Sequence, residues 1–221
     1  MFDFSGTLFR LEHDTSWLTE FTDDDGTALD IEAQTEIMRR MTAPSGQVVQ
    51  LSDEYQYAWD NRDLDPGLHQ KIYLEVLRKS GLRPEQAQAL YDRLVDPTEW
   101  TPYPDTQAAL KSVADTGLKV GVLSNIAFDI RPAFTGHGLA GHVDEFVLSF
   151  EVSAIKPDPS IFETLLGRLG VAPENALMVG DSEEADGGAK AIGCAFALVE
   201  PLPTAERSDA LLTALREHGV L

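Results

Sequence analysis

The sequence predicts an α/β protein with a three-layer core around a parallel sheet and an all-helical cap inserted after the first strand. From about Pro104 onward, short apolar runs alternate with segments of helical spacing, which is the pattern of strands joined by crossover helices. Residues 12–97 show helical spacing without good strand patterns. The 221 residues, 43% of them hydrophobic, suffice for one large core or for a core plus a smaller insert.

The first strand of the core is expected at the very start of the chain. Only Met1 and Phe2 precede Asp3, whereas a central strand commonly has about 5 residues. Either this strand is shortened or the true start lies earlier. Gly6 favours a turn directly afterwards, so Asp3 stands where the strand gives way to a loop.

The insert is expected to form a cap over the site. Pro97, Pro102 and Pro104 mark the return to the core. We therefore assign residues 1–11 and 98–221 to the core, and residues 12–97 to the helical cap. Helices of the cap are expected at residues 30–41, 47–61, 66–79 and 84–95.

The rest of the core is expected to alternate between helices and strands. Gly170 supports a helix end just before it, because glycine readily adopts the left-handed conformation found there. The helices are expected at residues 104–115, 158–169, 185–192 and 208–218, and the strands at residues 118–123, 145–149, 176–179 and 194–199.

Three polar residues follow strands of this sheet. Asp3, Ser124 and Asp181 each stand where an apolar run ends. Ligands of open parallel sheets bind beyond the carboxyl ends of the strands. These residues are therefore expected to converge at one edge of the sheet, although they lie far apart in the sequence.

Four short segments, taken in order along the whole chain, resemble the motifs of the haloacid dehalogenase superfamily. They are Asp3-Phe4-Ser5-Gly6-Thr7-Leu8, Ser124-Asn125, Lys156 within Ile155-Lys156-Pro157-Asp158-Pro159, and the acidic segment 179–186. The resemblance implies a Rossmann-like core with a helical cap. It also implies hydrolysis of a small phosphorylated metabolite through an aspartyl-phosphate.

The resemblance implies a role for each motif residue. Asp3 is the nucleophile, since a carboxylate can attack phosphorus and split one difficult step into two. Thr7 holds the loop or bonds the nucleophile, while the Ser124 hydroxyl and the Asn125 backbone N–H donate to phosphate oxygens. Lys156 binds the phosphoryl group and neutralises its charge and that of the nucleophile.

The acidic residues imply a Mg²⁺ site. Mg²⁺ prefers hard oxygen ligands, usually one or two carboxylates together with water and substrate phosphate. Asp3 and Asp181 would each supply one carboxylate oxygen, and the main-chain carbonyl of Ser5 another. Asp186 would orient these ligands or coordinate indirectly.

Ser5 departs from the family pattern. In most of the family's phosphatases this catalytic position holds a second Asp, which protonates the leaving group and then deprotonates water. Such help is typically worth ~10²–10⁴-fold, and a serine hydroxyl cannot supply it near neutral pH. One alternative is a phosphatase that acts on a leaving group of low pKa or that uses a substitute such as His13. Another is a dehalogenase- or phosphonatase-like hydrolase, and the third is a fold that binds a phospho-ligand or protein with little turnover.

Other residues weigh on these alternatives. Asp181 and Asp186 argue against a dehalogenase, because a metal-free site for a halocarboxylate has little use for them. A phosphonatase would need a Schiff-base lysine in the cap, where Lys71 and Lys79 lie without distinction. Arg10, just before the cap, is a further candidate for a contact with substrate or for an exposed position.

Charge and composition limit the partners. The net charge of −20, from 37 acidic and 17 basic residues, argues against nucleic acid or an anionic membrane surface as the partner. No apolar run approaches the roughly 20 residues of a membrane helix, and the N-terminus lacks a secretory pattern. The lone Cys194 is expected to be buried and suits a reducing cytoplasm. Nothing in the sequence indicates an oligomer.

Overall fold

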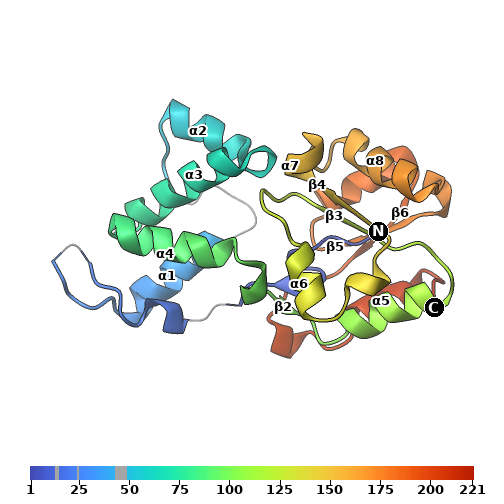
Figure 1. The fold of residues 1–221 in the computed structure, drawn as a ribbon, viewed down its shortest axis with the longest axis horizontal. Coiled ribbons are helices and arrows are strands. Elements are labelled where there is room, and N and C mark those ends of the chain that lie inside the picture. The colour runs from blue at the N-terminus through green and yellow to red at the C-terminus, as the bar shows by residue number, and fades with distance from the viewer. Residues whose placement is uncertain (13–14, 24, 43–48) are drawn as a thin grey trace.

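The centre of the protein is a parallel sheet (Figure 1). The computed structural model describes residues 1–12, 15–23, 25–42 and 49–221. In it, β3 (Gly121–Ser124) pairs with β4 (Glu145–Leu148), and β5 (Leu177–Gly180) pairs with β6 (Ala195–Leu198), both in parallel.

The start of the chain joins these two pairs into one sheet. Phe2 forms parallel bridges with Val122 on one side and Val179 on the other. Backbone hydrogen bonds of 2.9–3.0 Å bind residues 1–3 to both neighbours. The expected first strand is therefore present in shortened form between β3 and β5, and Asp3 stands at its carboxyl end.

Helices lie on both faces of the sheet and in the cap. In chain order they are α1 (Ile31–Thr42), α2 (Asp53–Asp60), α3 (Pro66–Lys79), α4 (Pro84–Leu94), α5 (Thr106–Asp115), α6 (Arg131–Gly136), α7 (Ser149–Val152), α8 (Pro159–Leu169) and α9 (Ala210–Glu217). The 3-10 helices are η1 (Thr15–Leu18), η2 (Arg62–Leu64), η3 (Pro97–Glu99), η4 (Ala140–His142), η5 (Pro173–Asn175), η6 (Asp186–Ile192) and η7 (Thr204–Glu206).

The strands bury alternating side chains in two different clusters. Leu123 and Val147 pack with the apolar residues of α8. Val122 and Val179 pack in the other cluster, which contains the apolar residues of α5 and α9. Since successive side chains of a strand point to opposite faces, helices cover both sides of the sheet. The expected three-layer α/β core is confirmed.

Several expected boundaries were wrong. The strand expected at residues 118–123 begins only at Gly121, and Leu118 is 51% exposed. Ser149 starts α7 instead of ending β4. The segment expected as a helix at residues 185–192 forms the 3-10 helix η6. Of the helix expected at residues 47–61, residues 47–48 lie outside the described residues, and α2 begins only at Asp53.

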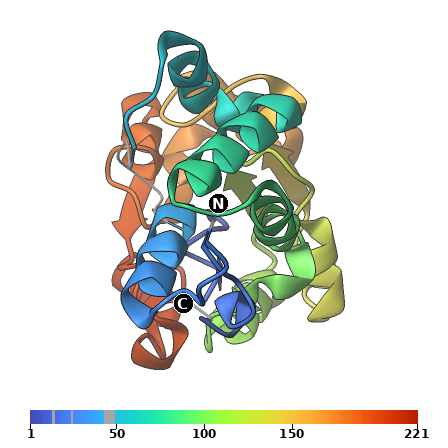
Figure 2. The same ribbon diagram turned by 90° about the vertical axis from the view of Figure 1, so that its left-hand side faces the viewer.

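The helices α1, α2, α3 and α4 gather beside the core (Figure 1), and Figure 2 shows α1, α3 and α4 in front of it. Ile37 and Met41 of α1 pack in one apolar cluster with Leu90 and Leu94 of α4. The same cluster contains the apolar residues of α5 and α9 in the core. The cap is thus packed against the core through a continuous apolar contact, which fixes its position over the sheet edge.

A short antiparallel pair marks where the chain leaves and re-enters the core. β1 (Phe9–Arg10) pairs with β2 (Thr101–Pro102), with Phe9 opposite Pro102. Two residues per strand are too few for a periodic pattern, so the sequence did not indicate this pair. It places both crossings between core and cap side by side.

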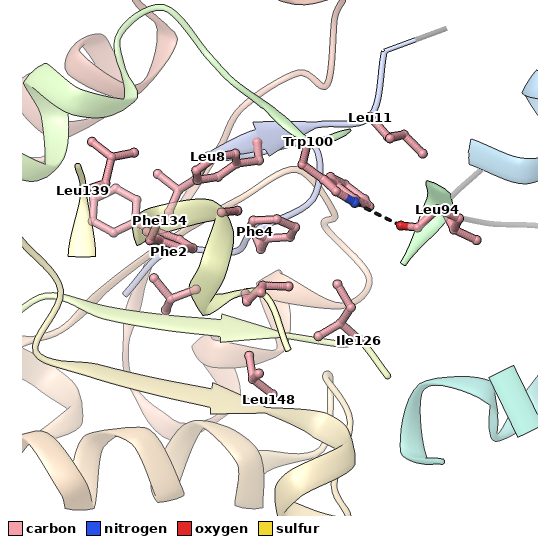
Figure 3. Packing of buried hydrophobic residues seen from close by; sticks show 14 of the residues in the cluster. Phe2, Phe4, Leu8, Leu11, Leu94, Trp100, Ile126, Phe134, Leu139 and Leu148 are labelled. Carbon is pink, nitrogen blue, oxygen red and sulfur yellow. Dashed lines mark hydrogen bonds between the residues drawn. The ribbon is translucent and has the colours of Figure 1, made fainter. Parts of the chain in front are cut away.

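Phe4 anchors the loop that follows Asp3. Its side chain is fully buried, and its ring centroid lies 5.0 Å from those of Phe9 and Trp100. Figure 3 shows Phe4 and Trp100 within the same group of buried side chains. Trp100 in turn donates its indole N–H to the Leu94 carbonyl at 3.0 Å. Because Phe4 is packed in this way, the backbone of the adjacent Asp3 has little freedom to move.

Two further expectations concern the whole chain. Cys194 is buried, as expected, and burial raises the pKa of its thiol. Among the described residues, none of the helices combines the length and the apolar character needed to cross a membrane.

We expect the cap to lose stability in acid through His69. This side chain of α3 is buried, and its Nδ1 lies 3.0 Å from the Tyr91 hydroxyl. Burial, aided by the charge of Arg62, lowers the pKa of His69 to about 3. Only the unfolded chain then binds a proton between about pH 3 and the usual histidine value near 6.5, so the free energy of unfolding falls as the pH drops through this window.

The expected contribution of His69 is about 2 kcal/mol near pH 5, because one pKa unit corresponds to about 1.4 kcal/mol. Urea unfolding of wild type and His69→Phe at about pH 7.5 and about pH 5 measures it as the difference between the two pH responses. Equal responses of the two proteins would show that His69 takes up a proton in the folded state.

Candidate functional site

A buried lysine lies at the centre of the candidate site. The Nζ of Lys156 is 2.5 Å from Asp3 Oδ1 and 2.6 Å from Asp186 Oδ1, and it donates to the Leu123 carbonyl at 3.1 Å. All three side chains are nearly inaccessible to solvent, with 7% or less exposed. The three ammonium donors are therefore all used, and the lysine is fixed in one orientation.

The backbone around Lys156 is held by the residue after Ser124. The side-chain oxygen of Asn125 accepts from the Lys156 N–H at 2.7 Å, and its amide nitrogen donates to the Lys156 carbonyl at 3.0 Å. On the other side, Gly188 lies so close to Pro157 that a Cβ on it would come within 2.6 Å of the proline ring. Asn125 thus positions the lysine loop through its side chain.

Three carboxylates meet at this edge of the sheet. Asp3, Asp181 and Asp186 each offer an oxygen, and these oxygens all lie within 4.8 Å of one another. Asp186 is already engaged by both oxygens, since Oδ1 faces Lys156 and Oδ2 accepts from the Ser182 N–H at 3.0 Å. The donor set therefore fits a small divalent cation held mainly by Asp3 and Asp181, with Asp186 orienting its surroundings.

The electrostatics of the cluster favour a bound cation. Burial raises the pKa of Asp3 to about 8, with Lys156 acting against this shift and Asp186 and Asp181 adding to it. Burial and Asp186 raise the pKa of Asp181 to about 6, whereas Lys156 and Arg207 act in the opposite direction. Burial lowers the pKa of Lys156, but Asp3 and Asp186 raise it above its usual range. The single ammonium of Lys156 cannot balance the negative charge of three carboxylates. The remaining charge must be offset by a cation or by protons.

Two glycines allow the carboxylates to approach the backbone. Gly6 has φ +76°, and a Cβ on it would lie 2.4 Å from Asp181 Oδ2. A Cβ on Gly180 would lie 2.2 Å from the Asp186 carboxylate. Any side chain at either position would displace an acidic residue from the cluster.

Two hydroxyls of the predicted phosphate-binding set lack partners. The Oγ atoms of Thr7 and Ser124 are buried and have no hydrogen-bond partner within the described part of the chain. Burying a hydroxyl without a hydrogen-bond partner costs free energy. Such a hydroxyl is therefore expected where a ligand oxygen binds. Ser5 is half-buried and forms a bridge with Phe9 at the turn after Asp3.

Other predicted candidates lie away from the cluster. Arg10 donates to the Pro201 carbonyl and pairs with Glu12, and its side chain is 21% exposed, so it is not an exposed residue. A contact of Arg10 with substrate stays a prediction. In the cap, Lys71 pairs with Glu54 and Lys79 donates to the Gln50 carbonyl. Neither lysine has the buried setting of a Schiff-base residue. His13 lies outside the described residues.

Three residues near the site were not found from the sequence. The Ser149 hydroxyl lies 2.5 Å from the Asp63 carbonyl of the cap and accepts from the Ile126 N–H at 2.8 Å, so it links the cap to the loop after β3. Asp63 belongs to the 3-10 helix η2, between α2 and α3. Its position between two expected helices was the one signal that the sequence offered for it. Arg207 contacts the loop after Asp3, and nothing in the sequence around it indicated this.

Fold and site together define a class of α/β protein in which the central strand ends in an aspartate that faces a buried lysine beneath an inserted helical cap. The sequence model of the haloacid dehalogenase-like hydrolases matches residues 1–193. The chain belongs to this family, and the resemblance deduced from the four motifs is confirmed.

Curated relatives of the chain include phosphatases. A phosphoserine phosphatase of Thermus thermophilus is 36% identical over 119 residues, which cover 53% of this chain and 48% of that protein. A ribulose-1,5-bisphosphate 5-phosphatase of Halopiger xanaduensis is 33% identical over 61% of this chain and 56% of its own length. The matched region thus spans about half the length of these relatives.

Solved structures with the same fold cover nearly the whole chain. The L-2-haloacid dehalogenase of Xanthobacter autotrophicus superposes with a TM-score of 0.65 at 25% identity, covering 96% of this chain and 81% of the other. A HAD phosphatase of Thermococcus onnurineus gives a TM-score of 0.58 at 24% identity, with 99% and 96% covered. These likenesses establish the fold of the core and the inserted cap.

Proposed function

We propose that the protein hydrolyses a small phosphorylated metabolite in a Mg²⁺-dependent reaction through an aspartyl-phosphate. The observation that carries this proposal is the carboxylate of Asp3, held by Lys156 beside two further carboxylates with oxygens within 4.8 Å. The phosphatases among the curated relatives support the same reaction class.

In the proposed first step, an oxygen of Asp3 attacks the phosphorus atom. The new O–P bond forms as the bond from phosphorus to the leaving oxygen breaks, and that oxygen takes up a proton. Water then attacks the phosphorus as the bond from phosphorus to the Asp3 oxygen breaks, and the water gives a proton back to the group that protonated the leaving oxygen. Inorganic phosphate leaves, and the Asp3 carboxylate is restored. Lys156 would exchange one of its three present contacts for a phosphoryl oxygen. The unpartnered Ser124 hydroxyl would bind another phosphoryl oxygen, and the Thr7 hydroxyl would hold the loop around them.

Mg²⁺ held by Asp3, Asp181 and the main-chain oxygen of Ser5 would neutralise negative charge on the transferred group. This protein needs such a local cation because its net charge of −20 repels a phosphorylated substrate at long range. The fixed ammonium of Lys156 contributes in the same direction.

A substrate panel tests the proposal. Phosphate release is measured from an aryl phosphate, phosphoserine, ribulose 1,5-bisphosphate and acetyl phosphate, with Mg²⁺ and with EDTA, and halide release from 2-chloropropionate. We expect Mg²⁺-dependent release of phosphate from at least one phosphate compound. Turnover that survives EDTA, or halide release without metal, contradicts the mechanism. Inactivity throughout favours a binding protein.

Ser5 leaves the source of the leaving-group proton open, and we propose Asp63 of the cap for this role. Its backbone is joined to the rim of the site through Ser149. Its side chain is 23% exposed and lies 3.9 Å from the Arg62 guanidinium. Burial raises the pKa of the Asp63 carboxyl, while the charges of Arg62 and Lys156 lower it, so this carboxyl group is within electrostatic range of the site.

Asp63→Asn is expected to lower kcat for alkyl phosphates by ~10²-fold and to leave aryl phosphates nearly unchanged, because only the poor leaving group needs the proton. Adding Ser5→Asp to this variant should restore alkyl turnover. Steady-state kinetics on matched alkyl and aryl esters measure both effects.

Asp60→Asn removes an exposed carboxylate from the end of α2 and serves as the matched control, with no expected effect on either ester. Equal losses on alkyl and aryl esters in Asp63→Asn would assign Asp63 a positioning role instead. Unchanged alkyl turnover would exclude it from proton transfer.

The setting of this activity follows from composition. We propose the cytoplasm as its compartment, since the single buried cysteine suits reducing conditions. The strong negative charge argues against nucleic acid as a partner.

A further inference from the structure

Arg207 lies directly after η7, and the two residues of the nucleophile loop that it contacts are 200 and 201 positions away in the sequence. Its side chain is buried, and one guanidinium nitrogen donates to the Gly6 carbonyl at 2.6 Å and to the Glu200 carbonyl at 3.3 Å. The other terminal nitrogen donates to the Thr7 carbonyl. The guanidinium carbon also lies 3.1 Å from the centre of the Tyr103 ring.

These contacts fall on the part of the loop that shapes the acidic cluster. Gly6 is the residue whose Cα packs against the Asp181 carboxylate, where a Cβ would come within 2.4 Å of Oδ2. The Ser5 carbonyl, a proposed cation ligand, belongs to the peptide unit directly before Gly6. A guanidinium that holds the next two carbonyls therefore fixes the direction of this peptide relative to Asp181.

The same C-terminal segment also holds the chain just beyond the loop. Arg10 donates to the Pro201 carbonyl, and the Thr204 N–H donates to Glu12 Oε1 at 2.9 Å. Residues 200–207 thus hold both the nucleophile loop and the start of the connection to the cap. This segment lies beyond residues 1–193, which the family model matches.

We propose that Arg207 is a positioning residue for the cation site: it holds the Ser5–Thr7 backbone so that the Ser5 carbonyl and Asp3 face Asp181. The inference rests on the proposed function, because it assigns Arg207 a part in assembling that site. Arg207 itself does not touch the reacting atoms.

The alternative is a purely structural role, in which Arg207 only holds the C-terminal segment against the core. The two alternatives differ in what the loss of the guanidinium changes. If Arg207 only holds the C-terminal segment, loss of the guanidinium lowers only the stability of the protein. If Arg207 positions the site, loss of the guanidinium also weakens Mg²⁺ binding, even well below the melting temperature, because the ligands are no longer held in one geometry.

The experiment compares Arg207→Met and Arg207→Lys with wild type. The readouts are the Tm shift caused by Mg²⁺, the half-saturating Mg²⁺ concentration, and kcat and KM for the best substrate. We expect Arg207→Met to raise the half-saturating Mg²⁺ concentration and to lower kcat, each by about 10-fold or more, with a smaller change in KM. Arg207→Lys keeps the charge but not the forked geometry and should lie in between.

Two controls separate positioning from stability. Arg216→Met removes an exposed arginine from α9 and should change none of these readouts. Leu211→Ala opens a cavity in the core contact of α9, so it should lower Tm while Mg²⁺ affinity remains that of wild type. If Arg207→Met fails to fold, Arg207→Lys carries the test.

Wild-type Mg²⁺ affinity in both Arg207 variants would overturn the inference. So would an equal loss of affinity in Leu211→Ala. If wild type binds Mg²⁺ but turns over no phosphate compound, the proposed function fails, and the Tm shift still decides the role of Arg207. A wild type that neither responds to Mg²⁺ nor turns over substrate overturns both.

Discussion

Asp3→Asn is expected to lower phosphatase turnover by about 10⁴-fold or more, since the amide cannot form the covalent intermediate. Phosphate release under saturating Mg²⁺, from protein purified in parallel with wild type, measures the loss. The fold should persist, because Asn keeps the size of the side chain at the end of the central strand. Turnover within a factor of about ten of wild type would remove Asp3 from the chemistry.

The same variant has an expected effect on stability in the absence of metal. Burial raises the folded-state pKa of Asp3 to about 8. A group whose pKa is raised on folding stabilises below its unfolded value, near 3.9, and this contribution is lost as the pH rises through the folded value. The free energy of unfolding of wild type in EDTA should therefore fall from about pH 4 to about pH 8, and Asp3→Asn should reduce this fall. Urea unfolding across this range measures it, and identical pH responses would contradict the assignment.

Lys156→Met is expected to destabilise the protein by about 3–5 kcal/mol, because it leaves buried carboxylates without their partner. Both Asp3 and Asp186 lose the ammonium at 2.5 and 2.6 Å. Turnover should also be lost, since the phosphoryl group loses its fixed cation. Urea unfolding and phosphate release are the measurements.

Two comparisons sharpen this expectation. Lys190→Met removes a half-exposed lysine that pairs with Glu183 at the surface, and it should cost less than about 1 kcal/mol. Adding Asp186→Asn to Lys156→Met removes one of the stranded charges and should recover part of the lost stability. A lysine variant as stable as wild type would mean that the carboxylates take up protons or a cation at little cost.

The sequence was most informative where structure follows from local chemistry. Asp158 caps α8 by accepting from the Ser160 N–H, and Gly170 ends that helix with φ +68°, so its ends were predicted closely. Strand starts were less certain, as in β3, because an exposed Leu118 looks the same as a buried one in a short apolar run. The 3-10 geometry of η6 had no signal that separates it from an α-helix.

In the candidate site, too, local motifs could be predicted from the sequence and long-range contacts could not. Asp3, Lys156, Asp181 and Asp186 were expected from short motifs in a fixed order, and the structure brings them together. The contacts of Ser149 and Arg207 escaped notice because their partners are main-chain carbonyls 86 and 201 residues away. Every residue has a carbonyl, so such an acceptor leaves no mark in the sequence.

The paired strands β1 and β2 have a mechanical consequence. Both covalent crossings between cap and core run through one antiparallel pair, while the Ser149–Asp63 contact near α7 lies on the other side of the junction (Figure 1). Besides its apolar contact, the cap is therefore attached to the core at two places, by the β1–β2 pair and by one side-chain hydrogen bond. A rotation of the cap about the β1–β2 pair would have to break this hydrogen bond and the apolar contact of α1 and α4 with the core.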